Sequence, residues 1–198
     1  MKEVAMNNPY LDEFLKSGGQ LGREWWWKDN LQMHTIEHMR CRDDCICEFG
    51  FAIPTEEAIE SLVRMSPLIE IGAGTGYWAK LITLNGGDIR AFDDWSWDGT
   101  LSLRFGKHFL VQKGGVERIS QHRDRTLFLC WPPYHTDMAE QCLSAYKGEL
   151  IAYIGEPAEG CCATDAFFDQ LHYDWELTEI ELPQWWGIHD ALFIGKRR

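Results

Sequence analysis

Hydrophobic residues along the chain fall into short runs separated by segments of helical spacing. Largely apolar runs at 68–71, 126–130 and 150–155 are typical of strands covered on both faces, as in a parallel sheet. Apolar positions within 55–65 keep the spacing of an amphipathic helix, and 175–182 alternates apolar with polar residues. The pattern predicts an α/β chain whose last part is a hairpin.

The order of the predicted elements indicates how the sheet is built. We expect strands at 68–71, 88–93, 109–112, 126–130, 150–155, 175–182 and 191–194, and helices that begin near 55, 77, 137 and 164. Thr55 and Thr164 are candidate helix caps, and Asp137 with Glu140 forms a pattern similar to a capping box at the start of a helix ending at Gly148. Strands that alternate with helices predict a mostly parallel sheet with helices on both faces.

The segment around the first predicted strand carries three glycines at alternate positions, in Leu68-Ile69-Glu70-Ile71-Gly72-Ala73-Gly74-Thr75-Gly76. Glycine suits a turn where the backbone takes positive φ or approaches a ligand closely. A dinucleotide fingerprint would need its third glycine at Tyr77, where a bulky side chain stands instead. The segment predicts a site for a nucleoside-like cofactor, and a nucleotide-binding domain of another kind stays the alternative.

This glycine spacing resembles the first motif of class I S-adenosylmethionine-dependent methyltransferases. The resemblance implies S-adenosyl-L-methionine as the cofactor, with its methionine and ribose portions held by Glu70, Gly72, Ala73, Gly74 and Gly76. Asp93 and Asp94 end the next predicted strand about twenty residues later, where a carboxylate accepts hydrogen bonds from ribose hydroxyls. The implied fold is Rossmann-like, with a mostly parallel seven-stranded sheet, an antiparallel last strand and helices on both faces.

A second motif, Trp131-Pro132-Pro133-Tyr134, follows the strand at 126–130. It resembles the Asn/Asp-Pro-Pro-Tyr motif of amino-methyltransferases, in which the first side chain and a neighbouring backbone carbonyl accept hydrogen bonds from the target NH2 and the Tyr stacks on its plane. Trp131 departs from that motif because an indole is a donor only. The backbone carbonyls of Cys130 and Trp131 remain as acceptors, which favours a planar or apolar amine over adenine or glutamine.

Ligands of an open α/β sheet bind beyond the carboxyl ends of its strands. That rule predicts a site for the methyl acceptor lined by Tyr134, His135, Glu156, Trp185, Trp186 and His189. Aromatic faces suit a planar ring or a cation. A neutral amine needs little help from a base, whereas a hydroxyl needs one, for which His135 and His189 are the candidates. With Trp131, Pro132 and Tyr134, these two histidines make up the predicted catalytic residues.

Composition narrows the range of partners and locations. The 198 residues are 45% hydrophobic and suit one domain, and the formal net charge of −12 disfavours nucleic acid as a partner. No apolar stretch approaches a bilayer span, and the first residues show no signal peptide. We therefore expect no membrane partner. Seven cysteines in a chain without secretory marks predict free thiols and a cytoplasmic location.

Residues 1–50 are polar and rich in Trp, and we expect a helical extension there, followed by the cofactor-binding domain at 51–198. Within the extension, Trp25-Trp26-Trp27 is interpreted as an anchor, with a lid over the cofactor as the alternative. A group of His and Cys residues invites a zinc interpretation: His34, His38, Cys41, Cys45 and Cys47. His34 and Cys45 would lie about 16 Å apart along a continuous helix, so one ion cannot bind them all, and we expect no metal site.

Three functional hypotheses follow. The leading one is a methyltransferase that transfers a methyl group from S-adenosylmethionine to a small-molecule or side-chain acceptor, with nitrogen the favoured atom. The second, motivated by Trp131, is an S-adenosylmethionine-binding module without catalysis. The third, motivated by the Pro-Pro-Tyr sequence, is a nucleic-acid amino-methyltransferase. The sequence leaves the acceptor and the oligomeric state open.

Overall fold

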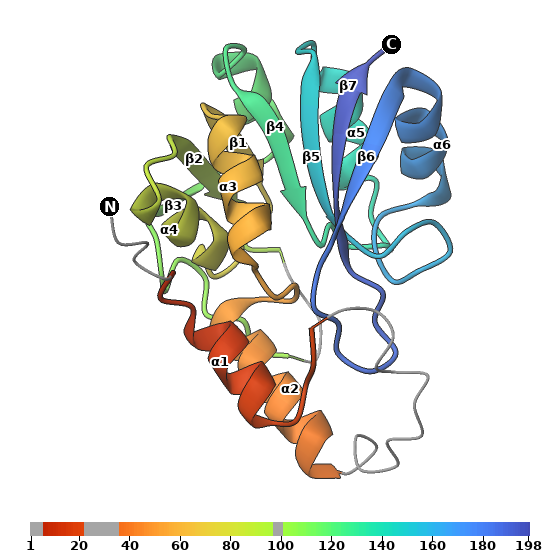
Figure 1. The fold of residues 1–198 in the computed structure, drawn as a ribbon. Coiled ribbons are helices and arrows are strands. Elements are labelled where there is room, and N and C mark those ends of the chain that lie inside the picture. The colour runs from red at the N-terminus through yellow and green to blue at the C-terminus, as the bar shows by residue number, and fades with distance from the viewer. Residues whose placement is uncertain (1–5, 22–35, 97–100) are drawn as a thin grey trace.

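The computed structural model describes residues 6–21, 36–96 and 101–198. Within this part seven strands form one sheet in the order β3-β2-β1-β4-β5-β7-β6 (Figure 1). The strands from β1 to β5 pair in parallel, and β7 is antiparallel to both of its neighbours. Their bounds are β1 Leu68–Ile71, β2 Ile89–Asp93, β3 Val111–Lys113, β4 Thr126–Cys130, β5 Leu150–Gly155, β6 Trp175–Glu181 and β7 Ala191–Arg197.

Helices cover both faces of this sheet. Those that the structure describes are α1 Pro9–Lys16, α2 Ile36–Phe49, α3 Glu56–Arg64, α4 Tyr77–Leu84, α5 Met138–Ala145 and α6 Asp165–Asp174, with a 3-10 helix at Val116–Gln121. The apolar residues of α3 and α4 pack with one face of the central strands, and those of α5 and α6 pack with the other face. The alternation of side chains along each strand therefore divides the core into two layers. The predicted fold class is confirmed.

Capping hydrogen bonds explain where α3 and α6 begin. Thr55 Oγ1 accepts a hydrogen bond from the Ala58 N–H, and Thr164 Oγ1 accepts one from the Phe167 N–H, as expected of N-caps. The predicted capping box at Asp137 is wrong. The Asp137 side chain makes no cap bond to the helix backbone and accepts instead from Gln141 Nε2. Glu140, the second residue of the predicted box, accepts from the hydroxyl of Thr164, the residue that caps α6.

Three predicted elements have a boundary that shifts by two residues or more. The third strand lies at Val111–Lys113 rather than 109–112, because its parallel pairing with β2 begins at Val111 opposite Ala91. Helix α5 ends at Ala145, before the predicted Gly148. The last strand reaches Arg197, because β7 pairs with β5 on one side and with β6 on the other along this length.

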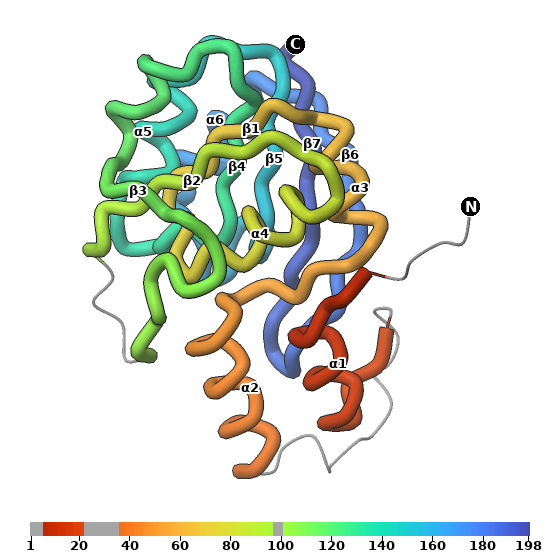
Figure 2. Tube along the Cα trace, turned by 90° about the vertical axis from the view of Figure 1, so that its left-hand side faces the viewer, coloured from red at the N-terminus to blue at the C-terminus, as the bar shows by residue number. Residues whose placement is uncertain are grey.

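Helices α1 and α2 lie beyond the end of the sheet at which the parallel strands terminate, as Figures 1 and 2 both show. Buried hydrogen bonds join α1 to the rest of the protein: the Asn8 side chain donates to the Pro54 carbonyl and accepts from the Tyr77 hydroxyl. The Tyr10 hydroxyl donates to the carbonyl of Phe51. The segment before β1 is therefore packed against the end of the sheet where the parallel strands terminate.

Candidate cofactor and acceptor site

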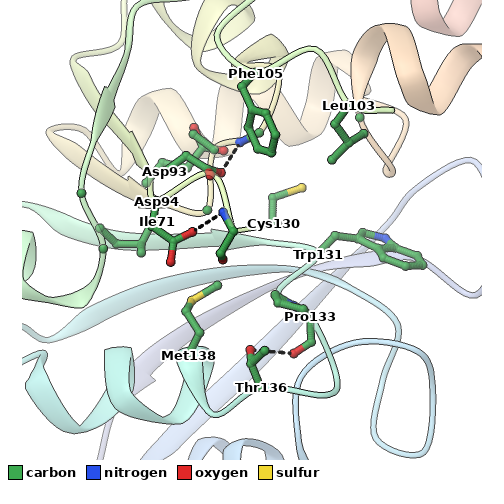
Figure 3. A pocket seen from close by; sticks show the side chains of 18 of the residues that line it. Ile71, Asp93, Asp94, Leu103, Phe105, Cys130, Trp131, Pro133, Thr136 and Met138 are labelled. Carbon is green, nitrogen blue, oxygen red and sulfur yellow. Dashed lines mark hydrogen bonds between the residues drawn. The ribbon is translucent and has the colours of Figure 1, made fainter. Parts of the chain in front are cut away.

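A cavity of about 770 Å³ opens at the carboxyl ends of the central strands. The chain runs outward from β1 to β2 and β3, then returns to place β4 on the other side of β1. Such a reversal of strand order leaves a crevice at the carboxyl ends of β1 and β4, and open α/β sheets bind ligands in this crevice. The glycine loop after β1 and the segment after β4 both line the cavity (Figure 3).

The three glycines of the loop share one backbone feature and differ in their surroundings. Gly72, Gly74 and Gly76 all have positive φ, at 81°, 51° and 75°, a region that side chains with a Cβ rarely adopt. A Cβ on Gly76 would lie 2.9 Å from Phe109 Cβ, and one on Gly72 would lie 3.2 Å from Met138 Cε. A Cβ on Gly74 would meet nothing within 4 Å. Because Gly74 lines the cavity, its bare backbone faces open space that a ligand can fill.

Asp93, at the end of β2, holds this loop in place. Its Oδ2 accepts a hydrogen bond from the Gly74 N–H at 2.9 Å, and its Oδ1 accepts one from the Trp95 N–H at 2.7 Å. Burial raises the pKa of this carboxyl group above its ordinary value, against the effect of these two hydrogen bonds. Each carboxylate oxygen keeps a further lone pair for a ligand. The neighbouring Asp94 is exposed, accepts from the Ser96 N–H and also lines the cavity.

Glu70 differs from every other buried acid in the described part of the chain. It is 1% exposed and lines the cavity, yet its Oε2 has no hydrogen-bond partner among the described residues. Burial, helped by the negative charge of Asp93, raises the pKa of Glu70 to about 8. A buried carboxylate oxygen without a partner is costly. This oxygen is therefore a hydrogen-bond acceptor that the described residues leave unsatisfied at the cavity.

Trp131 begins the segment after β4 and has a left-handed backbone, with φ of 52°. Its N–H donates to the Ile154 carbonyl at 2.8 Å, and its indole Nε1–H donates to Asp190 Oδ1 at 2.7 Å. Its ring stacks on Phe51, with centroids 4.4 Å apart and planes 11° from parallel. The indole donor is therefore directed at the protein rather than at a ligand, while the ring lines the cavity.

The other residues of the Trp-Pro-Pro-Tyr segment have separate surroundings. The Pro132 carbonyl accepts a hydrogen bond from the Ala163 N–H at 2.8 Å, and Pro133 lines the cavity. Tyr134 is 60% exposed and lies outside the cavity lining. His135 lines the cavity and meets the Tyr134 ring edge to face. The structure thus brings Trp131 and His135 to the site, whereas the Tyr134 side chain extends into solvent.

The residues predicted near β5 and the last loop lie apart from the cavity lining. Glu156 is buried and accepts from the Cys161 N–H and the His189 N–H, and its carboxylate lies 3.4 Å from His189 Nδ1. Trp185 is buried against Phe14 of α1, with the two rings edge to face, whereas Trp186 is half exposed. Of the predicted acceptor contacts, His135 therefore belongs to the cavity and the others do not.

Two segments that the sequence did not single out complete the cavity. Phe49 ends α2, and Gly50 and Phe51 follow it; the Thr75 hydroxyl of the glycine loop donates to the Phe49 carbonyl at 2.7 Å. Leu103 and Phe105, between β2 and β3, cover the cavity from the side opposite Pro133 and Met138 (Figure 3). No motif marks either segment. The aromatic residues at the end of α2 could have pointed to the segment 49–51, whereas nothing in the sequence points to Leu103 and Phe105.

Two further features of the sequence are the candidate metal ligands and the Trp-rich segment. Trp25-Trp26-Trp27 and His34 lie outside the described residues. In α2 the ring of His38 contacts the Ser17 carbonyl, and all seven cysteines are free thiols. Within residues 6–21, 36–96 and 101–198, no group of three or more His, Cys, Asp or Glu side chains is placed to hold a metal ion.

Comparison with models of known families finds no match, and comparison with curated proteins finds none either. Solved structures are similar in fold. Magnesium protoporphyrin IX methyltransferase (ChlM) from Synechocystis PCC 6803, solved with bound SAM, is 10% identical with a TM-score of 0.49, over 95% of this chain and 91% of that chain. The O-methyltransferase TomG from Streptomyces achromogenes, in complex with SAM, is 14% identical with a TM-score of 0.47, over 95% and 96%.

An rRNA methylase from Streptococcus thermophilus is 15% identical with a TM-score of 0.43, over 71% of this chain and 94% of that chain. At such identities and TM-scores, none of these proteins establishes what this chain binds or does. The function has to be argued from its own site.

Proposed function

We propose that the protein is a methyltransferase that uses S-adenosyl-L-methionine and acts on a small-molecule or side-chain acceptor, with nitrogen the favoured atom. The observation that carries the proposal is Glu70: a buried carboxylate with an unpartnered oxygen, facing a glycine cradle at the reversal of strand order. An ammonium or sulfonium is the chemical group that such an atom lacks.

The residues of the cavity fit this cofactor. Glu70 would take the positively charged methionine portion, the backbone around Gly74 would lie against the ligand, and Asp93 and Asp94 would accept from ribose hydroxyls. Asp93 and Asp94 give that wall a negative potential, and Glu70 adds its charge when it ionises, which favours a cationic ligand. When bound, S-adenosylmethionine supplies an electrophilic methyl group on a sulfonium, which is already a good leaving group.

The protein itself would act mainly by positioning. The Asp93 hydrogen bonds fix the loop, and the Phe51–Trp131 stack fixes the opposite side, so the reacting groups would meet in one orientation. Leu103 and Phe105 cover the cavity and would exclude water. His135 lines the cavity and is the candidate base for a hydroxyl acceptor, whereas His189 adjoins Glu156 outside it.

The partners follow from charge. A net charge of −12 and an acidic cavity wall disfavour a phosphate backbone as ligand, and a nucleic-acid amino-methyltransferase is accordingly disfavoured. No helix in the described part of the chain has the length and apolar character needed to cross a bilayer. We propose a cytoplasmic enzyme without a membrane partner, consistent with its seven free thiols.

Calorimetric titration with S-adenosylmethionine and S-adenosylhomocysteine tests the proposal. We expect binding of both, and at least a tenfold loss in Glu70→Gln because the amide removes the negative charge. Glu156→Gln is the matched control, since Glu156 is a buried glutamate with hydrogen-bond partners outside the cavity lining. If neither compound binds the wild-type protein, the proposal is wrong.

Trp131 also supports a second candidate, a cofactor-binding module without catalysis. Its indole donates to Asp190 and offers a ligand no hydrogen-bond acceptor. Incubation with S-adenosylmethionine and fractionated cell extract separates the two functions. Formation of S-adenosylhomocysteine supports the enzyme, and binding without turnover on any fraction supports the module.

A further inference from the structure

The two sides of the cavity differ in chemistry. Carboxylates and backbone amides lie toward β1 and β2, where Glu70, Asp93 and the glycine loop converge. The other side is richer in apolar side chains, where Figure 3 shows Leu103 and Phe105 opposite Pro133 and Met138, with Trp131 at one end and Thr136 beside Pro133. A ligand that enters this second side meets mostly hydrocarbon and π surface, so burial and stacking contribute most of its affinity there.

Trp131 is held on three sides. The backbone bond to Ile154, the indole bond to Asp190 and the stack on Phe51 together support a left-handed conformation that is unfavourable for a bulky residue. Asp190 is 1% exposed, comes from the loop before β7 and lies outside the cavity lining. It can therefore affect a ligand only through Trp131 or through the fold.

Two of the groups in this segment are unavailable to accept a hydrogen bond from a target NH2, which leaves the backbone carbonyls of Cys130 and Trp131. The side chain at position 131 is a donor, and its proton is bonded to Asp190. The neighbouring carbonyl of Pro132 already accepts from the Ala163 N–H. Two cationic residues, Lys113 and Arg118, also line the cavity. They lie at the end of β3 and just after it, on the side of the cavity next to β2, and Arg118 donates to the Lys113 carbonyl.

We infer that the side of the cavity formed by Trp131, Phe105 and Leu103 binds a flat, uncharged aromatic acceptor by stacking and burial, and that Asp190 is the positioning residue that orients the Trp131 ring for it. The inference rests on the proposed function, because it assigns the cofactor to the acidic side. A cavity of about 770 Å³ lies in the upper part of the roughly 300–1,000 Å³ range of ligand pockets, which allows a ring beside a cofactor.

A matched pair of probes tests the chemistry of this side. 1-Naphthol and decahydro-1-naphthol share a carbon skeleton and a hydroxyl and are both uncharged at pH 7, but only the first is flat and aromatic. With S-adenosylhomocysteine present, we expect 1-naphthol to bind about tenfold more tightly than its saturated analogue. We expect adenosine 5′-monophosphate to bind more weakly than 1-naphthol. Equal binding of the two naphthols, or tighter binding of the nucleotide, would overturn the inference.

Variants test the role of Asp190. Trp131→Leu and Asp190→Leu should each weaken 1-naphthol binding about tenfold and leave the affinity for S-adenosylhomocysteine within about threefold of wild type. Asp190→Asn keeps an oxygen that accepts from the indole and should retain naphthol binding, as a positioning role requires. A merely structural role would weaken both ligands together. If Asp190→Leu fails to fold, Trp131→Phe against Asp190→Asn makes the same comparison, because the first loses the indole proton and the second keeps its acceptor.

The proposed function and the aromatic acceptor site fail separately. Absence of S-adenosylhomocysteine binding in the wild-type protein contradicts the proposed function. Normal S-adenosylhomocysteine binding with naphthol affinity unchanged in Trp131→Leu contradicts the aromatic acceptor site alone.

Discussion

Replacing Glu70 with glutamine tests whether the unpartnered carboxylate serves a ligand or the fold. The side chain is 1% exposed and its pKa is about 8, raised by burial and by Asp93. At pH 7 about one molecule in ten of the free protein then carries a charged Glu70, and ionising the rest costs about 1.4 kcal/mol. A cationic ligand that requires the carboxylate must supply this free energy when it binds.

Cofactor binding should therefore release a proton. We expect close to one proton per bound S-adenosylmethionine near pH 7, and a dissociation constant that falls about tenfold between pH 6 and pH 7. The useful range ends near pH 7.5, because the amino group of the ligand itself loses its proton at about pH 8. Titration calorimetry in phosphate and in Tris measures the release, because the two buffers differ in ionisation enthalpy.

The same carboxyl group should make the free protein less stable in alkali. The folded pKa of about 8 lies above the ordinary value of 4.5, so the contribution of Glu70 to stability is complete below pH 4.5 and is lost as the pH rises through 8. Between pH 6 and pH 8 this amounts to about 2 kcal/mol of unfolding free energy. Without ligand at pH 8, Glu70→Gln should be more stable than wild type, although it binds the cofactor more weakly.

Denaturant unfolding at pH 6 and pH 8 measures this effect, with Glu156→Gln as the control that keeps Glu70. Opposite effects on stability and affinity are the signature of a residue kept for a ligand. If Glu70→Gln lowers stability at pH 8, or if cofactor binding by the wild-type protein releases no proton, the assignment of Glu70 to a cationic ligand is refuted.

Four further substitutions distinguish residues that serve the cofactor from residues that serve the fold. Gly76→Ala should cost about 2–5 kcal/mol of unfolding free energy, since its Cβ clashes with Phe109, whereas Gly74→Ala should cost about 1–2 kcal/mol and chiefly weaken cofactor affinity; denaturant unfolding and calorimetry would contradict this if the order were reversed. Asp93→Ala leaves the Gly74 N–H of the glycine loop and the Trp95 N–H after β2 without their acceptor and should weaken cofactor binding at least tenfold in the same titration. Thr164→Ala should cost about 0.5–2 kcal/mol in unfolding experiments through its lost cap, and a change in cofactor affinity would contradict that purely structural role.

The fold and the place of the glycine loop were predictable because their signals are local. A buried strand, a glycine loop and a helix follow one another within 68–84, and Asp93 ends the next strand. Parallel pairing of β1 with β2 then places these groups together without further information. The sequence indicates that Asp93 ends a strand beside the loop, although its bonds to the loop backbone required coordinates.

The apolar side was not predictable because distant residues form it. Phe51 and Trp131 stack although 80 positions separate them, and Trp131 finds its hydrogen-bond acceptor at Asp190. The sequence placed Trp185 near the acceptor, but its indole donates to the Tyr10 hydroxyl and its ring packs on α1. An aromatic residue in a loop can bury itself against any apolar surface within reach, and periodicity does not say which.

Buried acids of the described part of the chain show how to tell a structural carboxylate from one that awaits a ligand. Asp93, Glu156 and Asp190 all accept hydrogen bonds from the protein. These hydrogen bonds offset part of the free energy that each carboxylate loses when it is removed from water. Glu70 Oε2 is the exception, and it is also the atom that lies at the reversal of strand order. An apolar residue at this position would cost the fold less than Glu70 does, which supports the proposed cationic ligand beside the glycine loop.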